Sequence, residues 1–522
     1  MTLLDVVIFL PLVAFLLILV MSKENEEGIR RFSLVASLIV FFTSLGLLGP
    51  YWFSNPGKFV FETNVPWIET PAIRYHVAID GISLWLVLLT TLLTPLCVLV
   101  SWRYIQKHVK AFFAFLLLLE FGLIGVFCAF DFFLFYVFWE VSLVPMYFLI
   151  GVWGHERRIY SAVKFFLYTM AGSVLMLVGI IYLYNQAGTF DYTRILAGLQ
   201  SGTIASSYSE QLLLFLAFFI AFAIKVPLFP LHTWLPDAHV EAPTAGSVML
   251  ASVMLKMGTY GLLRFCVPMF PAAARNCSGW IATLAIIGII YGALVALVQP
   301  NMKKLVAYSS VSHLGFVVLG IFSFTQQGFD GAVYQMLNHG VSTGALFILV
   351  GFLYERQHSL EIASYGGVAT PAPNLAKIFM ITMLASIGLP MLNNFVGEFL
   401  VLQGTALVDF KWTIYAAIGV ILSACYMLWL YQRVFLGKAS DQVSHHMSDM
   451  SGREYAITLP LIILMVWMGT FTQTFIPSIS TSNAVLLGPV DAKRDVHVQN
   501  TGPGMLRALL SRLNLKEAVN AR

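Results

Sequence analysis

The amino-acid sequence predicts an all-α polytopic membrane protein with about 14 transmembrane helices, in which two inverted five-helix repeats each contain a broken helix. Three observations predict this fold. Of the 522 residues, 59% are hydrophobic and only 11% are charged, whereas soluble domains carry about 25% charged residues. Long apolar runs recur along the chain, and prolines interrupt two of them. The net charge of +4 is spread along the chain and gives no indication of nucleic-acid binding.

A helix needs about 20 mostly apolar residues to cross the hydrocarbon core of a bilayer. Fourteen runs meet this requirement, at roughly 3–21, 32–49, 82–101, 111–130, 132–152, 162–184, 211–229, 243–270, 279–298, 304–322, 331–353, 375–400, 412–434 and 454–473. Asp5 and the lack of a basic leading segment or a small-residue cleavage site indicate that the first run is a true span and not a signal peptide.

The distribution of lysine and arginine predicts the orientation. Sixteen of these residues are assigned to loops after odd-numbered spans, six to the loops on the other side and six to the C-terminal tail. We therefore expect the N-terminus and the C-terminal tail on the non-cytoplasmic side. Of the 30 lysines and arginines, only Lys225 and Lys256 are left within spans.

Prolines interrupt spans 7 and 12 at corresponding places. Pro227 and Pro230 closely follow Lys225, and Gly388-Leu389-Pro390 stands eight residues before Glu398. Each proline removes a backbone donor and frees a carbonyl. Paired interruptions of this kind are typical of transporters with inverted repeats, although ordinary proline kinks are an alternative.

Four regions follow from this pattern. Residues 1–110 form an N-terminal three-span region, 111–271 a first repeat (spans 4–8), 279–435 a second repeat (spans 9–13), and 436–522 the last span and a tail. Basic and apolar residues alternate at helical spacing over 505–513, so this tail either lies on the membrane surface or is flexible.

Seven ionisable side chains fall within the spans, where such groups cost at least a few kcal/mol and by default mark a transport or proton path. They are Glu120, Glu140, Lys225, Lys256, His313, His339 and Glu398. For Glu140 and Lys225 the alternative is a structural ion pair, and for His313 it is a core histidine bonded to a serine. Glu120 stands alone and is ambiguous.

The chemistry that these groups offer is proton transfer. If Glu140 moved from about 4 Å to about 8 Å from Lys225, their attraction would fall from roughly 4 to roughly 2 kcal/mol at an effective dielectric constant near 20. A change of this size is enough to load or unload a proton. The five cysteines contain no Cys-x-x-Cys pair, so the chain is a poor host for an iron–sulfur cluster. Cys266 and Cys277 flank a short loop and either pair or remain free.

Three sequence motifs carry a resemblance to a known family. Residues 225–251 read KVPLFPLHTWLPDAHVEAPTAGSVMLA, and LKMGTYG follows at 255–261. FWE stands at 138–140, and NMKKLVAYSS at 301–310 precedes His313. Over roughly 110–435 the chain resembles the antiporter-like membrane subunits of respiratory complex I and of multisubunit sodium/proton antiporters. Glu398, where most relatives have a lysine, favours the complex I branch.

The resemblance implies a role for each ionisable residue of the first repeat. Glu140 would tune Lys225, which would be the central proton-loading site, and Lys256 would relay charge along the middle of the membrane. His232 and His239 lie in the polar link after the broken helix, where they would give protons access from the cytoplasm. The alternative for these two histidines is a structural role, bonding the backbone that connects the helices.

The same resemblance assigns the second repeat. His313 and His339 would bridge towards Glu398, and Glu398 would connect the second half-channel to the far side or to the next subunit. The implied function is a proton-translocating membrane subunit of a proton-pumping NADH:quinone oxidoreductase in a bacterial inner membrane. No cofactor is expected on this chain; NADH, FMN, iron–sulfur clusters and quinone would be bound by partner subunits, and L-type and N-type antiporter-like subunits would be the neighbours.

Alternative functions share part of this evidence. A subunit of a multisubunit sodium/proton antiporter, or of a membrane-bound hydrogenase, would need nearly the same residues. A haem b electron carrier could use His313 and His339 as axial ligands, but the two buried lysines would then have no role. A membrane scaffold would leave all the buried charges unexplained.

Overall fold

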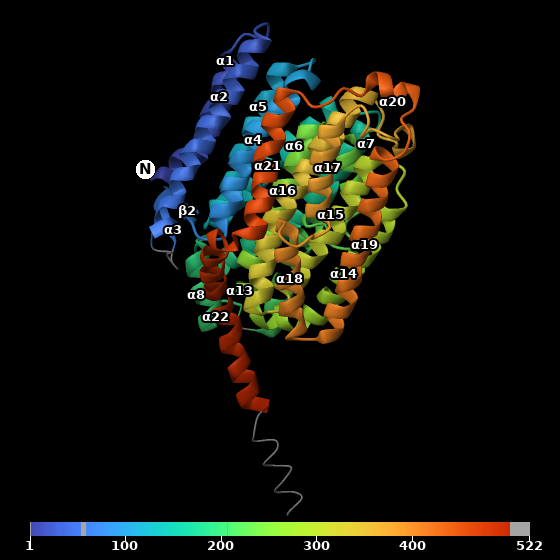
Figure 1. Cartoon of the computed structure of the whole chain (residues 1–522). Helices are drawn as coiled ribbons and strands as arrows, with labels where there is room; N and C mark the ends of the chain where they lie inside the picture. Colours follow the sequence, from blue (N-terminus) through green and yellow to red (C-terminus); the bar gives the residue numbers. More distant parts are fainter. Residues whose placement is uncertain (1, 54–58, 206, 502–522) are drawn as a thin grey trace, which may run out of the picture.

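The computed structural model describes residues 2–53, 59–205 and 207–501, and these form a bundle of long helices (Figure 1). The α-helices are α1 (Leu3–Val20), α2 (Glu26–Leu45), α3 (Gly49–Phe53), α4 (Ser83–Tyr104), α5 (Val109–Cys128), α6 (Phe132–Trp153), α7 (Arg158–Ala187), α8 (Tyr192–Ser201), α9 (Tyr208–Lys225), α10 (Trp234–Glu241), α11 (Thr244–Met249), α12 (Leu255–Gly261), α13 (Val267–Met269), α14 (Pro271–Leu297), α15 (Met302–Ile321), α16 (Gln326–Gln357), α17 (Pro373–Ser386), α18 (Asn393–Ala406), α19 (Phe410–Phe435), α20 (Asp441–His446), α21 (Gly452–Thr470) and α22 (Ile476–Thr501). Two π-helical segments, η2 (Leu250–Met254) and η3 (Leu262–Cys266), join α11, α12 and α13 into one continuous helix, and short 3-10 turns lie at η1 (Gly46–Leu48), η4 (Ile362–Ser364) and η5 (Thr472–Thr474).

The all-α membrane fold is confirmed. Within the described residues, twelve helices are long and apolar enough to cross a membrane, and each overlaps one of the fourteen predicted spans. The other two predicted spans are also helical: 375–400 is divided between α17 and α18, and 454–473 corresponds to α21. The division into four regions and the inverted relation of the two repeats stay predictions.

Both predicted helix breaks are present. Helix α9 ends at Lys225, and α10 begins only at Trp234, after two prolines that have no N–H to continue the ladder. Helices α17 and α18 are separated at Gly388-Leu389-Pro390, where Gly388 has φ of 77°. This left-handed conformation suits glycine because it has no Cβ.

One element departs from the all-α prediction. Strands β1 (Val60–Ile68) and β2 (Ile73–Ile79) form an antiparallel hairpin between α3 and α4. The hairpin is tied to α1 by Asp5, whose carboxylate accepts hydrogen bonds from Tyr75 Oη at 2.9 Å and Thr63 Oγ1 at 3.0 Å. The segment is too short and too polar for a span, so strand pairing satisfies its backbone groups instead.

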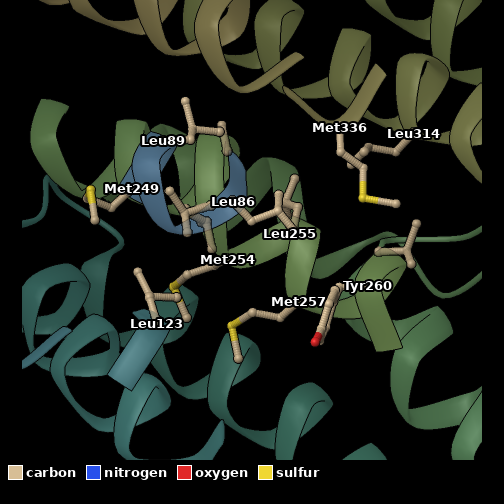
Figure 2. Packing of buried hydrophobic residues seen from close by; sticks show 14 of the residues in the cluster. Leu86, Leu89, Leu123, Met249, Met254, Leu255, Met257, Tyr260, Leu314 and Met336 are labelled. Carbon is tan, nitrogen blue, oxygen red and sulfur yellow. The ribbon is translucent and has the colours of Figure 1, made fainter. Parts of the chain in front are cut away.

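The helix that runs from Thr244 to Met269 lies at the centre of the bundle and is buried over its most apolar stretch. Figure 2 shows side chains of this helix, among them Met254 and Met257, which belong to the same buried cluster as Leu86 of α4, Leu123 of α5, Leu314 of α15 and Met336 of α16. A position at the centre of the bundle places Lys256 of this helix far from lipid.

Helices α1 and α2 lie along one edge of the bundle, and α22 extends beyond the end opposite α20 (Figure 1). Helix α22 was not among the predicted spans. It is fastened to α16 where Asn483 donates to Asp330 Oδ1 at 2.8 Å. The predicted surface helix at 505–513 lies outside the described residues.

Candidate functional site

In the first repeat, Glu140 lies on α6 and Lys225 at the last position of α9. Lys225 is 1% exposed, and its Nζ has no hydrogen-bond partner among the described residues. It lies 5.4 Å from the ring centroids of both Trp139 and Phe165. Glu140 acts on it electrostatically, but Glu140 Oε1 also lacks a partner. Glu140 and Lys225 therefore do not form the structural ion pair that was the alternative interpretation.

Four predicted residues come together, Lys256 of the predicted first repeat and three residues of the predicted second repeat. Lys256 Nζ lies 2.6 Å from His339 Nδ1 and donates to the carbonyl of Ala251 at 2.6 Å. The ring centroids of His339 and His313 are 6.0 Å apart, and His313 Nδ1 lies 2.8 Å from Glu398 Oε1. These residues come from α12, α16, α15 and α18, and all are at most 3% exposed. They form a buried line of protonatable groups with one gap, between the two histidines.

Two neutral residues that sequence reasoning missed complete the surroundings of Glu398. Gln335 Nε2 donates to Glu398 Oε1 at 3.0 Å, and Tyr426 Oη lies 3.4 Å from His313 Nε2. The signal for both was a polar side chain within a predicted span, but only ionisable groups were considered. His313 thus has a polar neighbour at each of its two ring nitrogens.

Helices α9 and α12 approach each other at Gly258. A Cβ at this position would lie 2.7 Å from the carbonyl oxygen of Phe222 and 2.8 Å from the amide nitrogen of Val226. Only a glycine allows α12 to pass so close to the end of α9. This contact sets the spacing between the helix that carries Lys225 and the helix that carries Lys256.

Among the described residues, the two histidines of the polar link make no hydrogen bond to this line, although His239 interacts electrostatically with Lys256 and His339. His239 is fully buried, stacks on Phe347 with ring centroids 4.6 Å apart, and has no hydrogen bond to either ring nitrogen within the described chain. The backbone-bonding role considered for this imidazole is thus not seen. His232 is 2% exposed and lies beside the rings of Phe229 and Tyr291. Glu120 is fully buried in α5, without a hydrogen bond to any other ionisable residue that the structure describes.

The prediction that Lys225 and Lys256 are the only cations within the spans is wrong. Arg264, counted as a loop cation, lies in η3 within the central helix and pairs with Asp80 just before α4. Burial alone would raise the pKa of Asp80, but the Arg264 guanidinium and hydrogen bonds from Ser83 hold that pKa below its usual range. Lys303 is also buried and donates to the carbonyl of Ala242 at 2.5 Å. Both residues stand near a span end, where sequence alone cannot separate loop from helix.

The alternative of a Cys266–Cys277 disulfide is not realised, since both thiols are free and buried. In the part of the chain that the structure describes, no three His, Cys, Asp or Glu side chains are grouped so that they could hold a metal ion.

Comparisons with known proteins agree with this geometry. The family described as NADH:quinone oxidoreductase/Mrp antiporter, TM matches residues 129–424. NADH-quinone oxidoreductase subunit M of Rhodobacter capsulatus is 46% identical over 498 residues, covering 93% of this chain and 95% of the relative. NADH-ubiquinone oxidoreductase chain 4 of Arabidopsis thaliana is 43% identical over 476 residues, covering 91% and 95%.

Solved structures show the same fold. A chain of respiratory complex I from Thermus thermophilus with bound NADH superimposes with a TM-score of 0.84 at 32% identity, covering 93% of this chain and 100% of that chain. A chain of an archaeal membrane-bound sulfane sulfur reductase has a TM-score of 0.83 at 20% identity, covering 94% and 98%, which shows likeness of fold alone.

Proposed function

The chain belongs to the family of antiporter-like membrane subunits of NADH:quinone oxidoreductases and Mrp antiporters, and from this premise we propose that it is the M-type, proton-translocating membrane subunit of an NADH:quinone oxidoreductase. The observation that carries the proposal is the buried line Lys256–His339–His313–Glu398, with contacts of 2.6 Å and 2.8 Å at its two ends. Groups at such distances can pass a proton directly. Ionisable side chains in a membrane protein by default mark such a path.

Lys225 and Glu140 are the proposed loading site. Because Lys225 Nζ has no hydrogen-bond partner among the described residues, a small movement of Lys225 changes its separation from Glu140 without breaking a hydrogen bond of its own. Doubling a separation of about 4 Å changes their attraction by roughly 2 kcal/mol at an effective dielectric constant near 20. A change of this size alters the proton affinity of Lys225. His232 and His239, in the polar link, are the proposed access from the cytoplasm.

The second repeat is the proposed outlet. A proton that reaches Lys256 passes to His339, crosses the gap between the two histidine rings and arrives at Glu398 through His313. Gln335 and Tyr426 hold Glu398 and His313 in place through the contacts described above. Movement of a side chain or a water molecule must close the 6.0 Å between the ring centroids, so this gap is where transfer can be controlled.

The energy for pumping must come from other subunits. We propose that NADH, FMN, iron–sulfur clusters and quinone are bound by partner chains, and that L-type and N-type antiporter-like subunits are the membrane neighbours. The relatives named subunit M support the coarser proposal that the chain works beside other subunits of such an enzyme. We also propose a bacterial inner membrane as the location, with both termini on the non-cytoplasmic side, since basic residues concentrate in the opposite loops. Co-purification with redox subunits in mild detergent would distinguish this function from that of a stand-alone sodium/proton antiporter.

The decisive variant is Lys225→Ala. It removes the proposed loading site, so NADH-driven proton pumping into membrane vesicles should be lost while the complex still assembles. Lys411→Ala is the matched control, because this lysine is exposed at the start of α19. Undiminished pumping by Lys225→Ala in an assembled complex would refute the proposed function.

A further inference from the structure

A buried ion pair outside the proposed proton path lies on the helix that carries Lys256. The Arg264 guanidinium pairs with the Asp80 carboxylate, and their side chains are only 3% and 7% exposed. The rings of Phe59, Phe130 and Tyr260 surround the guanidinium, at 5.9 Å, 5.5 Å and 5.6 Å from its centre. An ion pair enclosed by aromatic side chains is poorly screened by water, so it holds its two partners firmly together.

Asp80 connects this pair to a second helix. Its Oδ1 accepts hydrogen bonds from the backbone amides of Ile82 and Ser83, at 3.1 Å and 2.9 Å, and from Ser83 Oγ at 2.9 Å. These bonds satisfy amides at the start of α4 that have no partner within the helix. Its Oδ2 is the atom that faces Arg264. One carboxylate therefore fastens the central helix to the first turn of α4.

Arg264 stands eight residues beyond Lys256 on the same continuous helix, which is about 12 Å along the helix axis. Between them, Tyr260 donates its hydroxyl to the carbonyl of Phe127 at the end of α5, at 3.0 Å. Regular helix geometry does not fix the rotation of this helix, because π-helical segments lie on both sides of Lys256. Each wider turn changes the direction in which the following residues point. Contacts outside the helix must therefore set the direction of the Lys256 side chain.

The contact between Lys256 and His339 depends on this rotation, and its short distance tolerates little displacement. Lys256 Nζ lies 2.6 Å from His339 Nδ1, and a displacement of about 1 Å would take it out of hydrogen-bonding range. We propose that Asp80 and Arg264 are positioning residues for proton transfer, which hold the central helix in the rotation that keeps Lys256 Nζ on His339. The inference rests on the proposed function, and it adds a pair of residues that touch neither the proton nor its carriers.

The test measures proton pumping per NADH oxidised, as a function of pH, in the intact complex carrying Asp80→Asn. Misplacing a reacting group by about 1 Å can cost up to about 100-fold in rate. We expect pumping per assembled complex to fall by about tenfold or more and its pH profile to shift, because the environment of Lys256 changes. Asp80→Glu keeps the charge and should restore most of the pumping and the normal profile. Asp330→Asn is the matched control: Asp330 is also buried, but its partners Asn483 and Gln326 are neutral.

A purely structural role predicts a different result. Asp80→Asn would then lower the amount of assembled complex while each complex pumped at the wild-type ratio with an unchanged pH profile, and this outcome would overturn the inference. If Asp80→Asn does not assemble, Arg264→Lys is measured in the same way and judged by the same outcomes. Lys256→Ala, measured in parallel, separates the two claims. Normal pumping by Lys256→Ala would contradict the proposed function, whereas loss of pumping in Lys256→Ala with a normal Asp80→Asn would contradict only the positioning role.

Discussion

At the scale of single residues, the two central lysines are held in different ways. Lys256 has two partners, a backbone carbonyl and a histidine ring, at 2.6 Å each. Lys225 Nζ has no hydrogen bond within the described residues and lies over the rings of Trp139 and Phe165. A cation–π contact contributes roughly 0.5–2 kcal/mol and has little directional demand, so Lys225 can shift towards or away from Glu140. We infer that, of the two lysines, Lys225 carries the charge that can move and Lys256 carries a charge that is held in place.

Another residue-scale contact lies outside the spans. His76 of β2 is 1% exposed, and its ring nitrogens face Asp191 at 2.7 Å and Glu62 at 3.0 Å. Burial would raise the pKa of Asp191, but hydrogen bonds from His76, Thr193 and the amide of Arg194 outweigh it and lower the pKa to about 2. The pKa is lower in the folded state than in an unfolded chain. The stability that Asp191 contributes is therefore present above about pH 4 and is lost as the pH falls towards about 2.

The lowered pKa of Asp191 predicts that the stability of the hairpin depends on pH. The amide protection of residues 60–79 against hydrogen exchange, corrected for the intrinsic rate, should fall by about tenfold or more between pH 5 and pH 2.5. Asp191→Asn should weaken the protection already at neutral pH and remove most of the pH dependence. Glu69→Gln, at an exposed position, is the control. Protection that stays constant over this range in the unmodified protein would contradict the expected role of Asp191.

At the scale of elements, the broken helices could be predicted because the cause is local: a proline has no N–H wherever the chain goes. The β1–β2 hairpin could not be predicted in this way, since its strands are held by Asp5 on α1 and by Asp191 in the α7–α8 link. The residues of the candidate site also divide into those that the local sequence reveals and those that only tertiary contacts reveal. Lys225, Lys256 and Glu398 stand out in the sequence as charges in apolar runs. Gln335 and Tyr426 become part of the site only because α16 and α19 bring them to Glu398 and His313.

The close approach of α12 to α9 predicts the effect of enlarging Gly258. Gly258→Val should push α12 away from α9, because the nearest atoms are backbone atoms of Phe222 and Val226 that cannot move aside cheaply. Overpacking of this kind typically costs about 1–3 kcal/mol. The resulting displacement of Lys256 relative to Lys225 should lower proton pumping per assembled complex. Gly279→Val is the control, because no other atom lies within 4 Å of a Cβ at that position. Equal pumping by the two variants would show that this spacing is not needed.

At the scale of the whole molecule, the predicted even number of spans would place both termini on one side of the membrane. The predicted orientation can be tested by labelling single cysteines in intact cells with a membrane-impermeant maleimide, in a Cys425→Ser background. Lys107→Cys and Ser201→Cys both replace exposed residues, in a loop expected to be cytoplasmic and in one expected to be non-cytoplasmic. We expect only Ser201→Cys to react before the cells are opened. Labelling of Lys107→Cys alone would invert the orientation.

The sequence by itself determined the membrane as the solvent, the approximate positions of the twelve long apolar helices that the structure describes, the two helix breaks and most of the buried charges. Each of these depends on local composition or on the missing donor of proline. Tertiary structure alone decided which charges meet. Packing brings Lys256 to His339 and His313 to Glu398, and it places Arg264 in the core beside Asp80 and not in a loop. Among the described residues it gives Lys225 Nζ no hydrogen-bond partner. The physical reason is that an ion pair or hydrogen bond depends on distances below about 4 Å, and such distances between separate helices follow from packing that no short stretch of sequence contains.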